Sequence, residues 1–308
     1  MPENPHLDIL NREEPRAVAE QYFARQTELM RDLANYGSNL VIRAFNSSPK
    51  KMAEIIVCGV LLKQVVAMVD AAEVLFSAGC GHAAFLPVRT AFEASIYIDW
   101  ILLADSERRA TRYLVGNYRD ERVWANRAIS GTTEEISFSK VVNDLGVDIH
   151  KNRPTLTADA KMLLGEVNRV LAQPELLEID KEFTEVWKKR KREPKWYALD
   201  SLTSIRQIAD KVGRLAEYEF FYSKGSQVAH TDSYKDHIRF SNGQIDFIPI
   251  RHLADGNNLL NFMVPICLGT YRKILEHYRP AELTAFVQKY LNDWRDPFQN
   301  VVSVKYDF

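Results

Sequence analysis

Cysteine, glycine and proline are scarce in this chain, with 3, 13 and 12 residues among 308. The cysteines are scattered at Cys58, Cys80 and Cys267, which excludes a disulfide framework and a cysteine-rich zinc site. With 46% hydrophobic and 26% charged residues, the composition is that of an ordinary globular protein and excludes disorder, collagen and a coiled-coil rod. The length is sufficient to bury a sizeable core.

The chain also lacks an excess of charge of either sign. It has 40 Lys and Arg residues and 41 Asp and Glu residues, for a net charge of -1. This balance excludes a protein that holds nucleic acid through bulk charge, although it leaves room for a local basic patch. The sequence has no P-loop, dinucleotide fingerprint, His-Glu-x-x-His or Gly-x-Ser-x-Gly motif. Its 7 histidines show no close metal-ligand spacing. We therefore expect no metal and no cofactor.

No stretch of the sequence is both long and free of charge. The most apolar one, residues 52–76, carries four charged side chains, Glu54, Lys63, Asp70 and Glu73. Because a charge at the centre of a bilayer is costly, we expect a buried helix and no membrane association. Residues 1–15 are polar and acidic and lack the basic start and apolar core of a signal peptide. The expected location is the cytoplasm.

Helical periodicity dominates the chain and predicts an all-α helical bundle. Ser48 and Pro49 are typical of a helix start, and Gly79 is a natural helix stop. Gly213 is a second expected break. The predicted helices cover approximately residues 15–41, 49–79, 82–104, 106–128, 133–145, 157–171, 174–191, 201–230, 253–278 and 280–294.

The periodicity changes near residue 237. Asn242 and Gly243 lie between two short alternating runs, residues 237–240 and 244–248, and Asn-Gly in this setting predicts a β-hairpin. We expect one β-hairpin insertion near 237–248, followed by two C-terminal packing helices. The predicted domains are a helical bundle domain over residues 1–235, and the hairpin with the closing helices over 236–308, packed on the same domain.

Arg89 and Glu93 are four residues apart on the helix predicted for residues 82–104, so their side chains share one face. Phe92, Ile96 and Trp100 on the same helix are apolar. Burial of an unpaired charge is costly, so the two charges must meet each other or further partners. One interpretation is a structural ion pair. The other is a catalytic pair, or an anion-binding arginine held by a glutamate.

Tyr218, Tyr222, Ser226 and His230 recur at intervals of four along the helix predicted for residues 201–230. Each step turns about 400°, so the four side chains form one contiguous stripe. An imidazole is the usual general acid or base near neutral pH, and a cation at a helix C-terminus is favoured by the helix dipole. The stripe predicts either a catalytic surface or an aromatic stripe that faces the core and ends in a capping histidine.

A run of basic residues ends the helix predicted for residues 174–191, and two aromatic residues follow it. Cations beside aromatic rings can contact phosphates and stack a base, which predicts a nucleic-acid-binding patch. The alternative is a solvated helix end whose cations complement the dipole, with the aromatic residues in the core. The residues are Lys188, Lys189, Arg190, Lys191 and Arg192, then Trp196 and Tyr197.

Arg272 and His277 match an Arg-x4-His spacing found in HEPN-type ribonucleases. A pattern this short is expected by chance in a chain with 7 histidines. We therefore predict an ordinary exposed helical turn at this place.

Three short patterns occur in a fixed order along the chain: Arg89 to Glu93, then Trp196 leading to Ile205, Arg206 and Ala209, then Tyr222, Ser226 and His230. Together they resemble an uncharacterised bacterial family, the domain of unknown function DUF5677, over roughly residues 60–235. The resemblance implies an α-helical bacterial domain whose polar marks are Arg89, Glu93, Ser226 and His230. The chain is also distantly similar to HEPN-type bundles, in which Arg and His from a dimer of bundles cleave RNA without a metal ion.

These observations predict a HEPN-like, metal-independent RNA endonuclease of a bacterial defence or toxin system. In this hypothesis His230 is the general acid or base, Arg89 stabilises charge on the scissile phosphate, and Glu93 orients Arg89. Tyr222 and Ser226 lie beside them. The alternative is a non-catalytic helical binding or accessory module of such a system, and a third hypothesis is another enzyme that acts on a small anionic ligand.

The expected partners are RNA or another anionic ligand, and a protein. The apolar helices predicted near residues 52–76 and 82–104 offer more apolar surface than a thin bundle can cover. Because a two-fold interface between these helices would bury the excess, we expect a homodimer.

Overall fold

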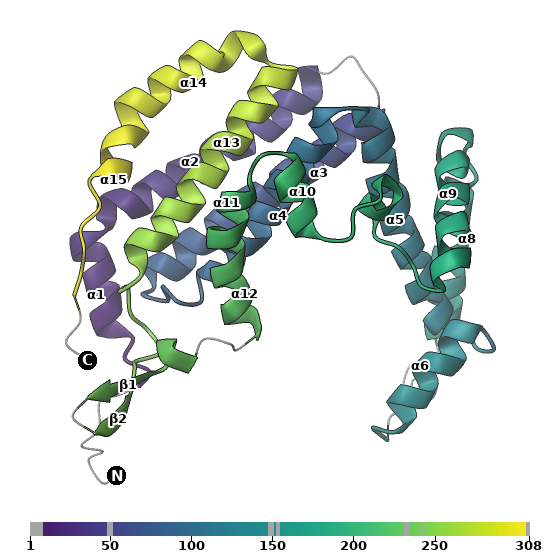
Figure 1. Ribbon diagram of the computed structural model, residues 1–308, viewed down its shortest axis with the longest axis horizontal. Helices are drawn as coiled ribbons and strands as arrows, with labels where there is room; N and C mark the ends of the chain where they lie inside the picture. The colour runs from purple at the N-terminus through teal and green to yellow at the C-terminus, as the bar shows by residue number, and fades with distance from the viewer. Residues whose placement is uncertain are drawn as a thin grey trace. The chain divides into compact units, whose positions relative to one another are not determined.

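The computed structural model describes residues 9–47, 52–146, 151, 155–230, 234–241 and 243–305. They form helices and one small hairpin (Figure 1), which confirms the predicted all-α class with a β-hairpin. The chain divides into two compact units, one of residues 1–104 with 205–308, and one of residues 105–204. The predicted boundary at residue 235 therefore falls inside the first unit. In the sequence, the second unit is inserted between residues 104 and 205 of the first.

Unit 1 contains most of the helices. Its elements are α1 (Glu13–Tyr22), α2 (Ala24–Ser47), α3 (Met52–Ser77), α4 (Phe85–Leu103), α10 (Ile205–Lys211), α11 (Leu215–Glu217), the π-helical turn η2 (Tyr218–Tyr222), α12 (Ser223–His230), η3 (Tyr234–Asp236), β1 (Ile238–Ser241), β2 (Gln244–Phe247), α13 (Gly256–Tyr278), η4 (Pro280–Glu282), α14 (Leu283–Lys289), the π-helical turn η5 (Tyr290–Trp294) and α15 (Arg295–Gln299).

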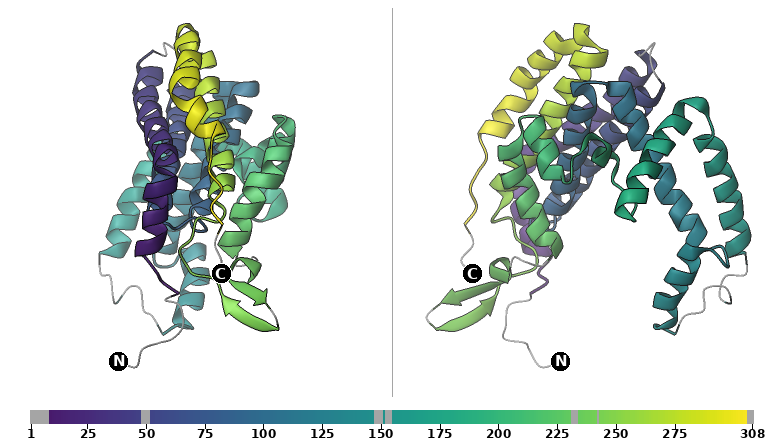
Figure 2. Two further views of the ribbon diagram at one scale, coloured as in Figure 1. Left: turned by 90° about the vertical axis from the view of Figure 1, so that its left-hand side faces the viewer. Right: turned by 45° about the vertical axis from the view of Figure 1, so that its right-hand side comes forward.

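The core of unit 1 is built on α3 and α4, with α2 and α13 packed against them (Figures 1 and 2). Many residues of α3 are fully buried, among them Cys58, Val65, Val69, Ala72 and Phe76. By length and composition α3 is apolar enough to cross a membrane, and half of its most apolar window is buried inside the protein. A helix that is apolar around its circumference is typical of the centre of a bundle.

Local signals account for most helix boundaries. Gly79 and Gly213 both end helices with positive φ, at 77° and 74°, as glycine permits at little cost. The single helix predicted for residues 15–41 is instead two, α1 and α2, and they meet at Phe23. The buried Phe23 ring packs edge-on against Phe76, with ring centroids 5.1 Å apart. The predicted helix start at Ser48 and Pro49 lies outside the described residues.

The hairpin has one apolar and one polar face. Ile238 pairs with Phe247 and Phe240 with Ile245 in an antiparallel register, and such cross-strand pairs point to the same side of a sheet. Gly243 has φ 77° in the turn, while its neighbour in the Asn-Gly pair lies outside the described residues. The apolar side chains of this face remain largely in solvent, with Phe240 67% and Phe247 69% exposed.

Unit 2 has its own core of helices and buried ion pairs. Its elements are α5 (Ser106–Arg127), α6 (Thr133–Asn143), α8 (Leu156–Leu171), α9 (Pro174–Arg190) and η1 (Trp196–Asp200). The buried Arg119 binds Asp180 at 2.6 Å and both oxygens of Glu193 at 3.0 Å. Because this arginine is only 5% exposed, its carboxylate partners are required to satisfy its charge.

Candidate functional site

The candidate site is built on the packing of α12 against α4. Tyr218 and Phe221 contact Phe92, whereas Gly225 lies over the first turns of α4, so the two helices run antiparallel. A Cβ atom on Gly225 would lie 2.6 Å from the Cβ of Arg89 and 2.8 Å from the Phe85 carbonyl oxygen. Only glycine allows this close approach, which brings the residues on either side of it to α4.

Arg89 is the polar centre of this contact. Its Nη2 donates a hydrogen bond to the Tyr222 hydroxyl at 2.7 Å, and its Nε lies 3.4 Å from Glu93 Oε1. The guanidinium carbon is 4.5 Å from the centroid of the Tyr222 ring. The Arg89 and Glu93 side chains are 21% and 28% exposed. The predicted ion pair is therefore present, and Tyr222 joins it from a helix more than a hundred residues away in sequence.

The environment of these side chains disfavours charge on the acidic groups. Burial raises the pKa of Glu93, against the opposing effects of Arg89 and Tyr222. Burial also raises the pKa of the Tyr222 phenol, together with the nearby negative charge of Glu93. The Tyr218 ring stacks on Tyr222 with centroids 4.7 Å apart. Both tyrosines lie on the π-helical turn η2, a distortion that is frequent at functional sites.

The other predicted residues of the stripe continue along α12. Ser226 is half-buried and His230 is exposed. His230 lies eight residues beyond Tyr222, or about 12 Å along the helix axis. Arg89 and His230 are thus carried by the same helix pair at different levels, and His230 is the last residue of α12. The following residues, 231–233, lie outside the described residues.

A polar cluster that the sequence did not predict lies beside the N-terminal end of α4. Lys224 Nζ is 2.8 Å from Asp236 Oδ2 and 3.8 Å from Asp255 Oδ2. His82 Nδ1 is 3.9 Å from Asp236 Oδ2, and the His82 and His237 rings are in edge contact with centroids 5.1 Å apart. We call these five residues the imidazole cluster. Lys224, where an Arg-x5-His pattern ending at His230 would have its arginine, binds carboxylates here.

Burial lowers the pKa of His82, although the charge of Asp236 opposes this shift. The lowered pKa favours the neutral imidazole of His82, which has a carboxylate beside it and can accept a proton. His237 is exposed at the start of the hairpin. No sequence pattern predicted this cluster, because its members come from four separate segments.

A second unpredicted group holds the π-helical turn in place. Arg214 binds Asp99 at 2.7 Å, Ser95 at 2.6 Å and Glu217 at 2.6 Å. Burial alone would lower the pKa of Arg214, but hydrogen bonds and charge from Glu217 and Asp99 raise it. Arg214 thereby connects α4 to α11 directly before Tyr218. Ser95 and Asp99, four apart on α4, were the available sequence signal.

The predicted basic run lies in unit 2 and is exposed throughout. Lys188 pairs with Glu185 at 2.7 Å, and Lys191 ends α9 with φ 56°. Trp196 and Tyr197 are buried, so they belong to the core of unit 2 and do not present ring faces for a base. Arg190 and Arg192, with Lys195, line a cavity of about 250 Å³ beside this run.

Two other sequence features have structural roles. His277 Nε2 lies 2.9 Å from Glu54 Oε1, and Arg272 pairs with Glu276 on the exposed helix surface. The Arg-x4-His match at this place therefore links helices and does not form a site.

Burial raises the pKa of Cys58 and Cys267 to about 12, so these thiols are inert. Within the described ranges, no group of three or more His, Cys, Asp or Glu side chains is arranged to hold a metal ion.

Comparison with known proteins finds one family whose model matches the chain. No curated protein and no solved structure matches the chain. A family of unknown function, DUF5677, matches residues 55–245, which span α3 to β2 and include unit 2. The match contains Arg89, Glu93, Tyr222, Ser226 and His230, the residues on which the resemblance was based. The chain therefore belongs to the DUF5677 family.

Proposed function

We propose that the chain is a HEPN-like, metal-independent RNA endonuclease that acts as a homodimer in the cytoplasm, within a bacterial defence or toxin system. The observation that best supports this is the antiparallel pairing of α4 and α12. Arg89 is fixed on this pair by Glu93 and Tyr222. His82 and His237 lie beside the N-terminal end of α4, the end toward which α12 runs to His230.

RNA carries its own nucleophile, so the proposed reaction needs proton transfer and charge stabilisation. His230, as general base, takes the proton of a 2′-hydroxyl while the 2′ oxygen bonds to the adjacent phosphorus. The bond from phosphorus to the 5′ oxygen of the next nucleotide breaks, and a protonated imidazole donates a proton to that oxygen. The products are a 2′,3′-cyclic phosphate and a 5′-hydroxyl end. Arg89 stabilises the negative charge on the phosphate oxygens during transfer.

The direct test is cleavage of single-stranded RNA in EDTA. The wild-type protein should produce cyclic phosphate ends, and His230→Ala should abolish them while the circular dichroism spectrum stays unchanged. Gln227→Ala is the matched control, because Gln227 is an exposed residue on the same helix, and it should keep full activity. A wild-type protein that leaves every RNA intact, or a fully active His230→Ala variant, would refute the proposed mechanism.

A non-catalytic binding or accessory module is the second candidate. The exposed apolar face of the hairpin favours it, because an isolated two-stranded hairpin needs a further surface to pack against. This candidate is tested if the wild-type protein cleaves no RNA. The wild type is then compared with a variant that carries both Phe240→Ser and Phe247→Ser. If the protein is a binding module, the wild type should bind a specific protein partner and the variant should not.

A further inference from the structure

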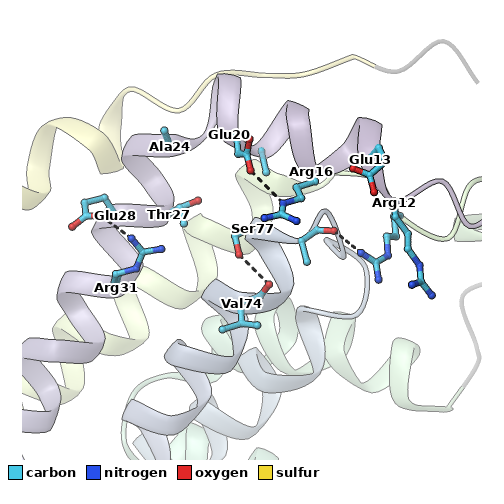
Figure 3. A pocket seen from close by; sticks show the side chains of 13 residues that line it. Arg12, Glu13, Arg16, Glu20, Ala24, Thr27, Glu28, Arg31, Val74 and Ser77 are labelled. Atoms are coloured by element: carbon cyan, nitrogen blue, oxygen red, sulfur yellow. Dashed lines mark hydrogen bonds and ion pairs between the residues drawn. The ribbon is translucent and has the colours of Figure 1, made fainter.

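A cavity of about 730 Å³ opens in unit 1 between α1, α2 and the end of α3 (Figure 3). Its volume is in the range of small-molecule sites. None of its lining residues belongs to the α4–α12 pair or to the imidazole cluster. The residues are Arg12, Glu13, Arg16, Ala19, Glu20, Ala24, Thr27, Glu28, Arg31, Val74, Ser77, Ala78 and Arg251.

Four arginines and three glutamates line this cavity. Two of the arginines are matched to carboxylates. Arg31 contacts Glu73 at 2.7 Å and Glu28 at 3.1 Å, and the charge of Glu73 helps to raise the pKa of Arg31. Arg16 contacts Glu20 at 3.3 Å. In Figure 3 the Arg16–Glu20 pair lies on α1 and the Arg31–Glu28 pair lies on α2.

The other two arginines have no carboxylate partner within the described part of the chain. Arg251 Nη1 donates to the carbonyl oxygen of Ala78 at 3.1 Å, just beyond the C-terminal end of α3. This bond fixes the guanidinium at the rim and leaves its remaining N–H groups available. Arg12 precedes the first turn of α1 and carries no ion pair in the described ranges.

The walls between these arginines are made of small side chains. Ala19, Ala24 and Ala78 leave the space that larger residues would fill, and Thr27 and Ser77 add hydroxyl groups. The Ser77 hydroxyl bonds to the Val74 carbonyl at 3.1 Å, so it stays ordered at the wall. The cavity therefore combines a compact, partly apolar body with two arginines that make no ion pair in the described ranges, and Glu13 is the remaining glutamate of its lining.

We propose that this cavity binds a small phosphorylated ligand whose phosphate lies between Arg12 and Arg251. The planar N–H fork of a guanidinium fits phosphate in a bidentate way. Two arginines that make no ion pair in the described ranges can both donate to a phosphomonoester or diphosphate, and the small residues accommodate its organic part. The site is independent of the proposed nuclease reaction, which uses other residues.

Isothermal titration with inorganic pyrophosphate and with ADP tests the proposal. Each should bind the wild-type protein, and Arg12→Gln and Arg251→Gln should each weaken binding about tenfold or more. Arg25→Gln is the matched control, because Arg25 is an exposed arginine of α2 that pairs with Asp296 outside the cavity, and it should bind like the wild type. Ala24→Phe, which fills the cavity without changing its charge, should weaken the binding of ADP.

Four results would overturn the proposal. The first is no binding of pyrophosphate or ADP by the wild type at millimolar concentration. The second is unchanged binding by the double Arg12→Gln, Arg251→Gln variant, and the third is equal binding of citrate, which would remove the preference for phosphate. Arg12 is exposed, so Arg12→Gln keeps the fold and remains decisive even if loss of the Arg251 bond to Ala78 unfolds the chain. A 5′-phosphorylated oligonucleotide that binds more tightly than ADP would also contradict a small-molecule site.

Discussion

The guanidinium of Arg89 donates to the hydroxyl of Tyr222 at 2.7 Å and lies against the face of the same ring. This one relationship joins α4 to the π-helical turn that leads into α12. It also holds Arg89 in one orientation, since Glu93 Oε1 lies 3.4 Å from the Nε of the same guanidinium. Arg89 therefore contacts both Glu93 on its own helix and Tyr222 on η2.

The stability of the protein should depend on pH through Glu93. Because burial raises the pKa of Glu93 in the folded state, the folded protein binds this proton more tightly than the unfolded chain. The stabilisation is therefore fully present below the ordinary carboxyl pKa of about 4.5 and is lost as pH rises through the raised folded value. Urea denaturation of the wild type and of Glu93→Gln between about pH 4 and 7 measures the free energy of unfolding of each. If the difference between the two free energies does not change with pH, Glu93 does not have a raised pKa in the folded protein.

Gly225→Ala should destabilise the protein by about 1–3 kcal/mol, because the new methyl group would collide with Arg89 and with the Phe85 carbonyl. Gly59→Ala and Gly269→Ala are matched controls on other helices, and nothing lies within 4 Å of their added Cβ atoms. They should leave stability unchanged or raise it by about 0.5–1 kcal/mol. Chemical denaturation of all three variants distinguishes a packing effect from helix propensity. Equal effects at the three positions would show that α12 does not pack this closely on α4.

Arg214→Ala should lower the free energy of unfolding by about 3–5 kcal/mol, since it leaves Asp99 and Glu217 without their counter-ion in a part-buried site. Arg206→Ala is the control. Arg206 pairs with Glu219 on the exposed surface, and its loss should change stability by less than about 1 kcal/mol. Thermal melting of both variants checks the prediction. A melting temperature for Arg214→Ala equal to that of Arg206→Ala would mean that this network does not hold η2.

The basic run should provide any affinity for RNA that the protein has. Replacing Lys188, Lys189 and Arg190 by Gln should weaken binding and reduce the slope of log K against log salt by about 2, because each lost phosphate contact removes about 0.7 for a single strand. Lys140 and Lys161 are exposed lysines of the same unit, and their double Gln variant is the control. Fluorescence anisotropy at several salt concentrations measures both. If the slope is the same in the two variants, the run is only a solvated helix end.

Much of the local structure could be predicted because its causes are local. The 3.6-residue period sets the helices, and glycine at positive φ sets the stops at Gly79 and Gly213. The spacing of Arg89 and Glu93 places them on one helix face whatever surrounds that helix. The same holds for the hairpin, whose register follows from its alternating residues and short turn.

The sequence alone therefore determined the all-α class, most helices, the hairpin and the family to which the chain belongs. Only the tertiary structure decided that residues 105–204 form a unit of their own, that Tyr222 meets Arg89, that Asp236 meets His82 and Lys224, and that four arginines surround one cavity. The physical reason is that these contacts join segments far apart in the chain. They depend on how whole helices pack, and no spacing within a single segment records that packing.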